Sequence, residues 1–242
     1  MKSSSCLDIR LRPDESLDEF LEGRIKIIQS KAGYRFSIDA ILLSEFATIR
    51  PGDIVLDLGT GCGIIPLLLL ATKPVSFAVG IEIQADLADQ AGRNAAINNL
   101  GNKMSVILGD IKNVPITPAS ADVVTCNPPF HEKDSGRLNP DPQKAIARHE
   151  ILTSLDDILR TSLRLLRTKG RLALIYPADR LPELLAGMRG CNLQPKVMRI
   201  VYPSLKSNAK LVLVEAVLGG RSGLKILPPL IDQGRFSIKD RA

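Results

Sequence analysis

The sequence has no tryptophan and few other aromatic residues, with six Phe and three Tyr in 242 residues. This composition disfavours an aromatic-rich β-sandwich and suits a parallel sheet packed by aliphatic side chains between helices. Cysteine and histidine are also scarce: four cysteines stand at positions 6, 62, 126 and 191, without a Cys-x-x-Cys pair, and there are two histidines. Such spacing supports neither a zinc site nor a disulfide framework. We therefore expect a reduced, cytoplasmic protein that binds no metal.

Long apolar runs are missing as well. The longest, Ile64–Ala71, covers eight residues and contains Pro66, and a transmembrane helix needs about twenty apolar residues. The segment Met1–Cys6 lacks the apolar core of a secretory signal. We expect no association with a membrane. The hydrophobic content of 45% and charged content of 24% are those of a globular chain, long enough for one sizeable α/β domain.

Negative charge is scarce in the last third of the chain. Residues 160–242 contain 16 Lys/Arg and 5 Asp/Glu, a net charge of +11, whereas residues 1–159 contain 16 and 21, a net charge of −5. This asymmetry indicates a polyanionic partner near the C-terminal third. A basic surface that is only solvated is the alternative interpretation.

The order of apolar segments predicts a single domain over residues 1–242. Residues 1–19 are polar and acidic, and we expect a loose arm there. Residues 20–50 predict a hairpin turning at Lys31–Gly33, followed by a helix. From residue 51 onwards strands and helices alternate to form the core.

The second half of this core departs from strict alternation. Thr153–Asp156 resembles a capping box, which opens a helix expected to stop near Gly170. Two later β-rich runs, 196–202 and 210–218, have little helix between them. Adjacent strands without a helical crossover are antiparallel. We therefore expect a mixed seven-stranded sheet with an antiparallel C-terminal strand and helices on both faces, a Rossmann-like α/β fold.

A glycine loop carries the first chemical signal. Asp57-Leu-Gly59-Thr-Gly61-Cys-Gly63 comes directly after a predicted strand and before a helix, where doubly wound folds bind nucleotides. Ile64 stands where a dinucleotide fold needs its third glycine, which disfavours NAD and FAD. Asp57 would lie unfavourably beside a pyrophosphate, but it suits the cationic amino group of S-adenosylmethionine (SAM).

Two more acids follow the next two predicted strands. Glu82 ends the second strand, where a carboxylate can accept hydrogen bonds from both ribose hydroxyls. Asp110 follows the third strand and could accept from the adenine amine of the cofactor. The two acids and the glycine loop, placed after three successive strands, together predict a SAM site.

The fourth strand leads into Asn127-Pro128-Pro129-Phe130. Two consecutive prolines fix a rigid turn, which leaves the Asn127 side-chain oxygen and the Pro128 carbonyl free to accept from the NH₂ of a ligand. An exocyclic base amine is a poor nucleophile because its lone pair is conjugated with the ring. Two acceptors favour a pyramidal nitrogen, whose lone pair can then attack a methyl group. Phe130 could stack on the base.

Together the glycine loop and the Asn-Pro-Pro-Phe tetrapeptide resemble those of class I SAM-dependent methyltransferases that act on amino groups. Three narrower segments, Gly33–Asp39, Ile146–Glu150 and Leu224–Leu230, resemble the tRNA adenine-N6 methyltransferase family, whose bacterial members modify an anticodon-loop adenine in a valine tRNA. The similarity runs over about residues 17–237. One departure is Phe130-His131, where many adenine enzymes have Tyr.

The resemblance implies roles for single residues. Those implied to bind SAM are Phe36, Asp39, Asp57, Gly59, Gly61, Gly63, Glu82, Asp110 and Asn127. Those implied to be catalytic are Asn127, Pro128, Pro129 and Phe130. We interpret residues 131–150 as a loop that closes on RNA. The expected phosphate contacts are Arg137, Lys144 and Arg148 in this loop and Arg199, Lys206, Lys210, Arg221 and Lys225 after it.

The expected function is methyl transfer from SAM to the exocyclic amine of an adenine in RNA, with an anticodon-loop adenine of tRNA as the substrate. Because of Phe130-His131, a guanine-N2 rRNA methyltransferase is an alternative function. A protein glutamine methyltransferase would present an amide NH₂ to the same acceptors. A non-catalytic module that binds SAM and docks on RNA is the remaining alternative.

Overall fold

The computed structural model describes residues 11–32, 35–128 and 153–231. Within them the N-terminal segment forms a hairpin of β1 (Glu15–Phe20) and β2 (Ile25–Ser30), which pair antiparallel. The hairpin turns at residues 21–24, where Leu21, Glu22 and Gly23 adopt positive φ angles of 52°, 58° and 79°. Two predictions were therefore wrong: residues 15–19 are a strand and not part of a loose arm, and the turn precedes Lys31–Gly33.

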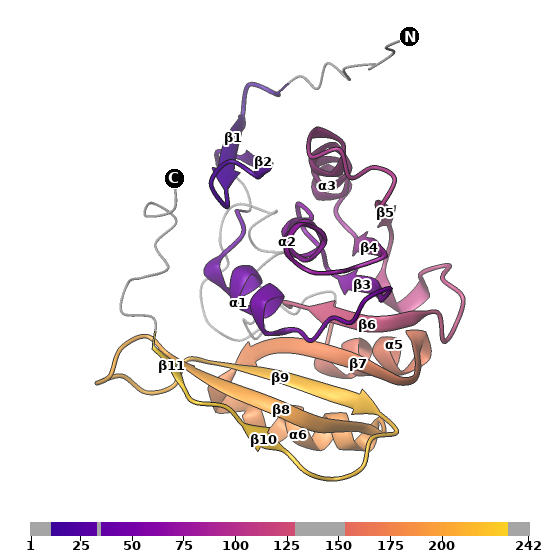
Figure 1. Ribbon diagram of the computed structural model, residues 1–242, viewed down its shortest axis with the longest axis vertical. Helices are drawn as coiled ribbons and strands as arrows, with labels where there is room; N and C mark the ends of the chain where they lie inside the picture. Colours follow the sequence, from indigo (N-terminus) through magenta and orange to yellow (C-terminus); the bar gives the residue numbers. More distant parts are fainter. Residues whose placement is uncertain (1–10, 33–34, 129–152, 232–242) are drawn as a thin grey trace.

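After the hairpin, helices and strands alternate as expected (Figure 1). The helices are α1 (Ile38–Phe46), α2 (Ile64–Thr72), α3 (Ala85–Ile97), α5 (Leu155–Leu165) and α6 (Leu181–Gly190). The strands are β3 (Ile54–Leu58), β4 (Phe77–Glu82), β5 (Met104–Leu108), β6 (Ala121–Cys126), β7 (Leu166–Pro177), β8 (Leu193–Tyr202), β9 (Leu211–Leu218), β10 (Lys225–Ile226) and β11 (Leu230–Ile231). Short 3₁₀ turns cover Ile111–Asn113 and Ala178–Arg180.

These strands form one sheet in the order β10-β8-β9-β7-β6-β3-β4-β5, with β11 also paired to β8. Strands β5, β4, β3, β6 and β7 are parallel, whereas β9 is antiparallel to both β7 and β8. The mixed sheet with an antiparallel C-terminal strand is confirmed for its seven principal strands. Two short strands, β10 and β11, extend its edge beyond the prediction.

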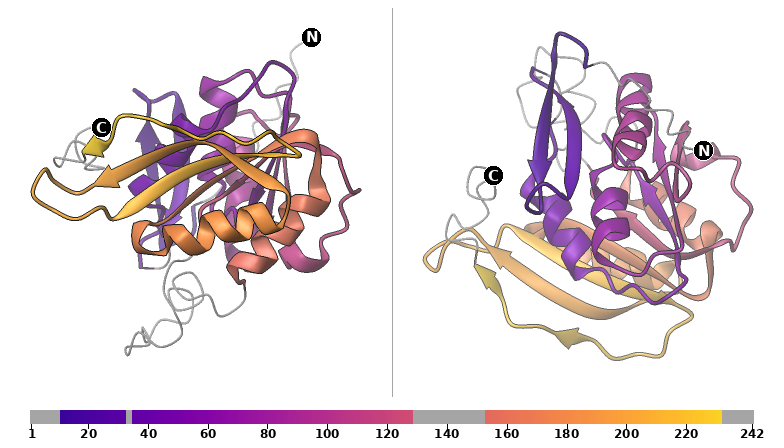
Figure 2. Two further views of the ribbon diagram at one scale, coloured as in Figure 1. Left: turned by 90° about the horizontal axis from the view of Figure 1, so that it is seen from below. Right: turned by 45° about the horizontal axis from the view of Figure 1, so that its top comes forward.

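Helices cover both faces of the sheet, as predicted (Figure 2). One hydrophobic cluster joins the hairpin, α1 and α2 to one face, with Leu43 and Leu67 at its centre. The other joins α5 and α6 to the opposite face, around Leu159 and Leu184. Because the sheet is buried on both sides, its central strands are rich in aliphatic residues.

Helix α5 differs from its prediction at both ends. Its capping box consists of Ser154 and Asp157, one residue later than expected. It ends at Leu165 and not near Gly170, because the backbone N–H groups of Ala119 and Ser120 bond to the carbonyls of Arg164 and Leu165 at 3.0 Å each. These bonds direct the chain straight into β7.

Candidate active site

The parallel strands β3, β4 and β6 end at the same edge of the sheet, at Leu58, Glu82 and Cys126. The predicted site residues follow these ends. Four of them, Gly59, Glu82, Asp110 and Pro128, line one cleft of about 400 Å³. The structure thus brings together residues from four separate segments of the chain.

The glycine loop between β3 and α2 is fastened to the neighbouring strand. The backbone N–H groups of Gly59 and Thr60 both bond to the carbonyl of Ile81, at 2.9 and 3.0 Å. Gly63, with φ of 85°, caps the N-terminus of α2. The positive φ favours glycine at this position, and a Cβ there would also lie 3.1 Å from the Cβ of Ala91, a tight contact. The loop can therefore bring its backbone close to a ligand.

Asp57, the last but one residue of β3, is completely buried under this loop. Its Oδ1 accepts a hydrogen bond from the Thr125 hydroxyl at 2.6 Å, and its Oδ2 has no hydrogen bond of normal geometry among the described residues. Burial raises the pKa of Asp57 to about 7, although the bond from Thr125 acts in the opposite direction. A buried carboxylate oxygen without a hydrogen bond of normal geometry would suit the ammonium group of SAM, because that group would stabilise the charged form, although Asp57 itself is not among the described residues that line the cleft.

Glu82 is almost fully buried at the end of β4. Its Oε2 accepts from the backbone N–H of Gly61 at 2.8 Å, and its Oε1 accepts from the N–H of Gln84 at 2.9 Å. Burial raises the pKa of Glu82, against the effect of these backbone bonds. Since each carboxylate oxygen has a second lone pair, Glu82 keeps the capacity to accept from ribose hydroxyls.

Asp110 follows β5 and caps the short turn Ile111–Asn113, where its Oδ1 accepts from the Lys112 N–H at 3.0 Å. Its side chain is partly exposed toward the cleft. Apolar residues that the sequence reasoning missed complete this wall. They are Ile83 and Ile111. Ile83 is 41% exposed in the structure, and no pattern in the sequence marks it as a site residue.

Asn127 and Pro128 follow β6 on the other side of the glycine loop. Asn127 is half-buried, and Pro128 is buried in the wall of the cleft. The predicted positions Pro129 and Phe130 lie outside the described residues, as do Arg137, Lys144 and Arg148. The described part of the tetrapeptide thus stands beside the predicted cofactor residues.

The thiols near this site are poor nucleophiles. Burial raises the pKa of Cys62 to about 12 and that of Cys126 well above its ordinary value. Because only the thiolate attacks readily, both cysteines act as apolar packing residues. Within the described residues, no three His, Cys, Asp or Glu side chains gather in a way that could hold a metal ion.

Phe36 and Asp39, which we expected to close over the cofactor, are not among the described residues that line the cleft. Phe36 is buried in the core and packs edge-to-face on Phe20, with ring centroids 5.0 Å apart. Asp39 is in the first turn of α1, where its carboxylate accepts from the Ser37 hydroxyl at 2.9 Å. Their proposed cofactor role stays a prediction.

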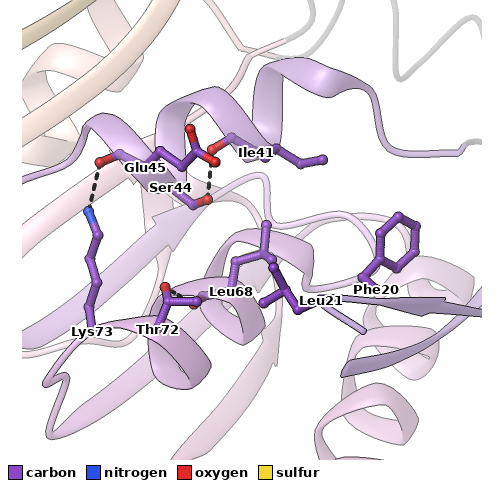
Figure 3. Close-up of a pocket in the computed structure, with 8 residues that line it drawn as sticks. All are labelled: Phe20, Leu21, Ile41, Ser44, Glu45, Leu68, Thr72 and Lys73. Carbon is purple, nitrogen blue, oxygen red and sulfur yellow. Dashed lines mark hydrogen bonds between the residues drawn. The ribbon is translucent and has the colours of Figure 1, made fainter. Parts of the chain in front are cut away.

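A larger hollow of about 700 Å³ opens near Phe20 (Figure 3). Its polar groups bond to the protein's own backbone: Ser44 donates to the Ile41 carbonyl, Thr72 to that of Leu68, and Lys73 to that of Glu45. Volume alone would favour this hollow, but it contains no predicted site residue. The predicted site residues point to the smaller cleft.

The predicted RNA contacts in the C-terminal third lie at different ends of the strands of the sheet. Lys206 and Lys210 stand between β8 and β9, at the edge where the cleft lies, and both are exposed. Arg221 follows the other end of β9, and its carbonyl accepts from Lys196 at 3.2 Å. Arg199, half-buried, and Lys225, exposed, lie along β8 and β10 between these ends.

No helix among the described residues has the length and apolar character to cross a membrane.

A family model described as "Methyltransferase domain" matches residues 49–218. A tRNA1(Val) (adenine(37)-N6)-methyltransferase from Porphyromonas gingivalis is 34% identical over 175 residues, which cover 69% of this chain and 68% of that protein. The protein of the same name from Parabacteroides distasonis is 30% identical over 193 residues, with 79% and 80% covered.

Solved structures agree on the fold. A predicted O-methyltransferase from Agrobacterium tumefaciens has a TM-score of 0.65 and 20% identity, covering 81% of this chain and 88% of its own. Geranyl diphosphate C-methyltransferase from Streptomyces coelicolor has a TM-score of 0.55 and 16% identity, with 74% and 79% covered. At these identities the likeness concerns the fold alone. On its sequence relatives and family model, the chain belongs to the methyltransferase-domain family and, within it, to the tRNA1(Val) (adenine(37)-N6)-methyltransferase family.

Proposed function

We propose that this protein transfers the methyl group of SAM to N6 of an adenine in the anticodon loop of a tRNA. One observation carries the proposal: Asn127-Pro128 follows β6 beside the cleft that Gly59, Glu82 and Asp110 line. The names of its relatives give adenine 37 of tRNA1(Val) as their substrate. The basic C-terminal third supplies the charge that RNA binding requires.

Each residue has a task that follows from its place. The glycine loop and Asp57 hold the amino acid end of SAM, and Glu82 accepts hydrogen bonds from its ribose. Asp110, together with Ile83 and Ile111, binds the adenine ring of SAM. SAM supplies a methyl carbon on a positively charged sulfur, which an amine lone pair attacks in one displacement. The Asn127 oxygen and the Pro128 carbonyl each accept a hydrogen bond from one N6–H. These bonds favour a pyramidal nitrogen, so that the lone pair of N6 leaves conjugation with the ring. The surplus proton leaves N6 for water after the nitrogen–carbon bond has formed.

The first experiment measures transfer from labelled SAM to unmodified bulk tRNA and identifies the nucleosides by mass spectrometry. We expect N6-methyladenosine. N2-methylguanosine would instead establish a guanine enzyme, and labelled protein without labelled RNA would establish a glutamine methyltransferase.

The variant Asn127→Ala separates an enzyme from a binding module. We expect kcat to fall by about 100-fold or more, because hydrogen bonds aimed at the reacting group matter chiefly in the transition state. The affinities for SAM and RNA should stay close to those of the wild type. A protein that binds both ligands and shows no turnover even as wild type would be a non-catalytic module.

A further inference from the structure

The connection between β8 and β9, Pro203–Lys210, lies at the carboxyl ends of the parallel strands, where the cleft also lies. Leu211 at the start of β9 pairs with Pro177, the last residue of the parallel strand β7, and with Val201 near the end of β8. The Lys210 carbonyl accepts from the Ala178 N–H at 3.1 Å, which fastens the connection to the end of β7. In Figure 1 and in the left view of Figure 2 it projects beyond the body of the domain.

This connection displays a leucine to solvent. Leu205 is 76% exposed, the largest exposed fraction of any large apolar side chain in the described part of the chain. The turn around it is held by its own hydrogen bonds, since Ser207 N–H donates to the Ser204 carbonyl at 3.2 Å and the two hydroxyls of Ser204 and Ser207 lie 2.6 Å apart. A hydrogen-bonded turn therefore presents Leu205 outward.

The connection that carries Leu205 has two cations and no acid. The C-terminal part of the sheet around it is also basic in sequence, with seven Lys/Arg and one buried acid, Glu215, between residues 184 and 231. Arg221, however, lies at the other end of β9, and the acid Asp179 follows Ala178 at the end of β7. Lys206 and Lys210 are both exposed and belong to the same connection as Leu205. Such an apolar tip among cations, at the edge that holds the cleft, matches the two components of a single-stranded nucleic acid: apolar base faces and anionic phosphates.

We propose that Leu205 packs against the face of a base of the bound RNA a few nucleotides from the target adenine, while Lys206 and Lys210 hold the adjoining phosphates. The proposal rests on the proposed function. Proteins that insert leucine between bases use the same contact to unstack nucleotides.

The sheet order fixes the reach of this contact. Strand β7 separates β6 from β9, and β7 and β9 together separate β6 from β8, so the connection lies two to three strand spacings, about 10–14 Å, from the end of β6. Stacked nucleotides rise by about 3.4 Å each. The base that Leu205 contacts is therefore about three to four nucleotides from the target adenine.

The test compares Leu205→Ala and Leu205→Phe with wild type and with Leu163→Ala. Leu163 is a matched control, because it is 40% exposed near the end of α5, at the opposite sheet edge. We expect Leu205→Ala to lower kcat/KM for tRNA about tenfold, in line with the loss of one partly buried leucine. Leu205→Phe should retain kcat/KM, because a flat ring stacks on a base, and all variants should keep the SAM affinity of wild type.

A second readout distinguishes contact with a base from mere packing of the loop. 2-Aminopurine placed singly along an anticodon stem-loop RNA should change its fluorescence on binding at about the third or fourth nucleotide from the target, and Leu205→Ala should abolish that change. Lys206→Ala should instead reduce the salt dependence of binding. Equal kcat/KM and equal fluorescence for Leu205→Ala and wild type would overturn the proposal. A wild-type enzyme that methylates no tRNA would overturn the proposed function itself.

Discussion

The carboxylate of Glu82 accepts the backbone N–H of Gly61 at 2.8 Å, and so joins the last residue of β4 to the loop that follows β3. The residue that we expect to bind the ribose thus also fixes the loop that approaches the amino acid end of the cofactor. Its other oxygen accepts from Gln84 at the start of α3. Loss of this carboxylate should therefore affect both binding and stability.

We expect Glu82→Gln to weaken SAM binding at least about tenfold, because an amide has one acceptor oxygen and cannot satisfy both N–H groups and the ribose. The free energy of unfolding should fall by about 1–3 kcal/mol, the cost of leaving a buried N–H without a partner. Titration calorimetry and urea unfolding measure the two effects. Glu45→Gln, an exposed carboxylate of α1, is the control and should change neither. Unaltered SAM affinity in Glu82→Gln would contradict the ribose assignment.

Asp57 makes stability depend on pH in an unusual direction. Burial raises its pKa from 3.8 to about 7, so between these values the folded protein holds a proton that the unfolded chain has released. Stability from this group is therefore highest at low pH and falls as pH rises toward 7. Relative to Asp57→Asn, we expect wild type to lose up to about 4 kcal/mol of stability between pH 4 and pH 8.

Urea unfolding of the two proteins across this pH range measures the difference. Asp57→Asn keeps the size of the side chain and can still accept from Thr125, so that packing changes little. Stability curves that run parallel from pH 4 to pH 8 would show that Asp57 titrates normally.

Gly80 in β4 has no room for a side chain, because a Cβ would lie 2.6 Å from Cγ2 of Thr60. Thr60 belongs to the glycine loop, and its N–H bonds to the Ile81 carbonyl. We expect Gly80→Ala to destabilise the protein by about 1–3 kcal/mol through overpacking and to weaken SAM binding, because the loop must shift. A Cβ at Gly92 in α3 would meet nothing within 4 Å, and Gly92→Ala should stabilise the helix by up to about 1 kcal/mol. Thermal unfolding with and without SAM compares the two, and a neutral Gly80→Ala would contradict the tight contact.

The sequence was sufficient to predict the parts of the fold that short-range pattern determines. The strands that end at Leu58, Glu82 and Cys126 are buried on both faces, so their aliphatic runs are easily recognised in the sequence. Once these strands were predicted, the acids and glycines at their ends could be identified as site residues. The edge at which they meet comes from the parallel topology. The bond from Gly61 to Glu82 and the apolar wall at Ile83 depend on geometry that no spacing in the sequence reveals.

Two of the errors have the same physical cause, because they depend on contacts between distant segments. Helix α5 ends at Leu165 because the N–H groups of Ala119 and Ser120 take its last carbonyls. Strand β1 was missed because its polar residues look solvated. Glu15 is nevertheless buried, and its partner Arg93 lies 78 positions later in the chain.

That partnership holds the hairpin on α3. Arg93 Nη1 donates to Glu15 Oε2 at 2.8 Å, a second bond joins Nη2 to Oε1, and Gln90 donates to Oε1 at 3.3 Å. The hydrogen bond from Arg93 holds the pKa of Glu15 down at about 2. We expect Arg93→Ala to cost about 3 kcal/mol at pH 7, because it leaves a buried carboxylate without its charge partner. The double variant Glu15→Gln/Arg93→Ala should be more stable than Arg93→Ala, since no unpaired charge remains.

The dependence on pH follows from the direction of the shift. A carboxyl whose folded pKa is lowered from 4.5 to about 2 contributes stability that is complete above pH 4.5 and is lost as pH falls toward 2. The difference in unfolding free energy between wild type and Arg93→Ala should therefore shrink between pH 5 and pH 2.5. Urea unfolding at several pH values measures it, with Arg160→Ala as the control, because the Arg160–Asp156 pair is exposed on both sides. If the difference in unfolding free energy between wild type and Arg93→Ala stayed constant over this range, the pair would hold the hairpin through packing and not through charge.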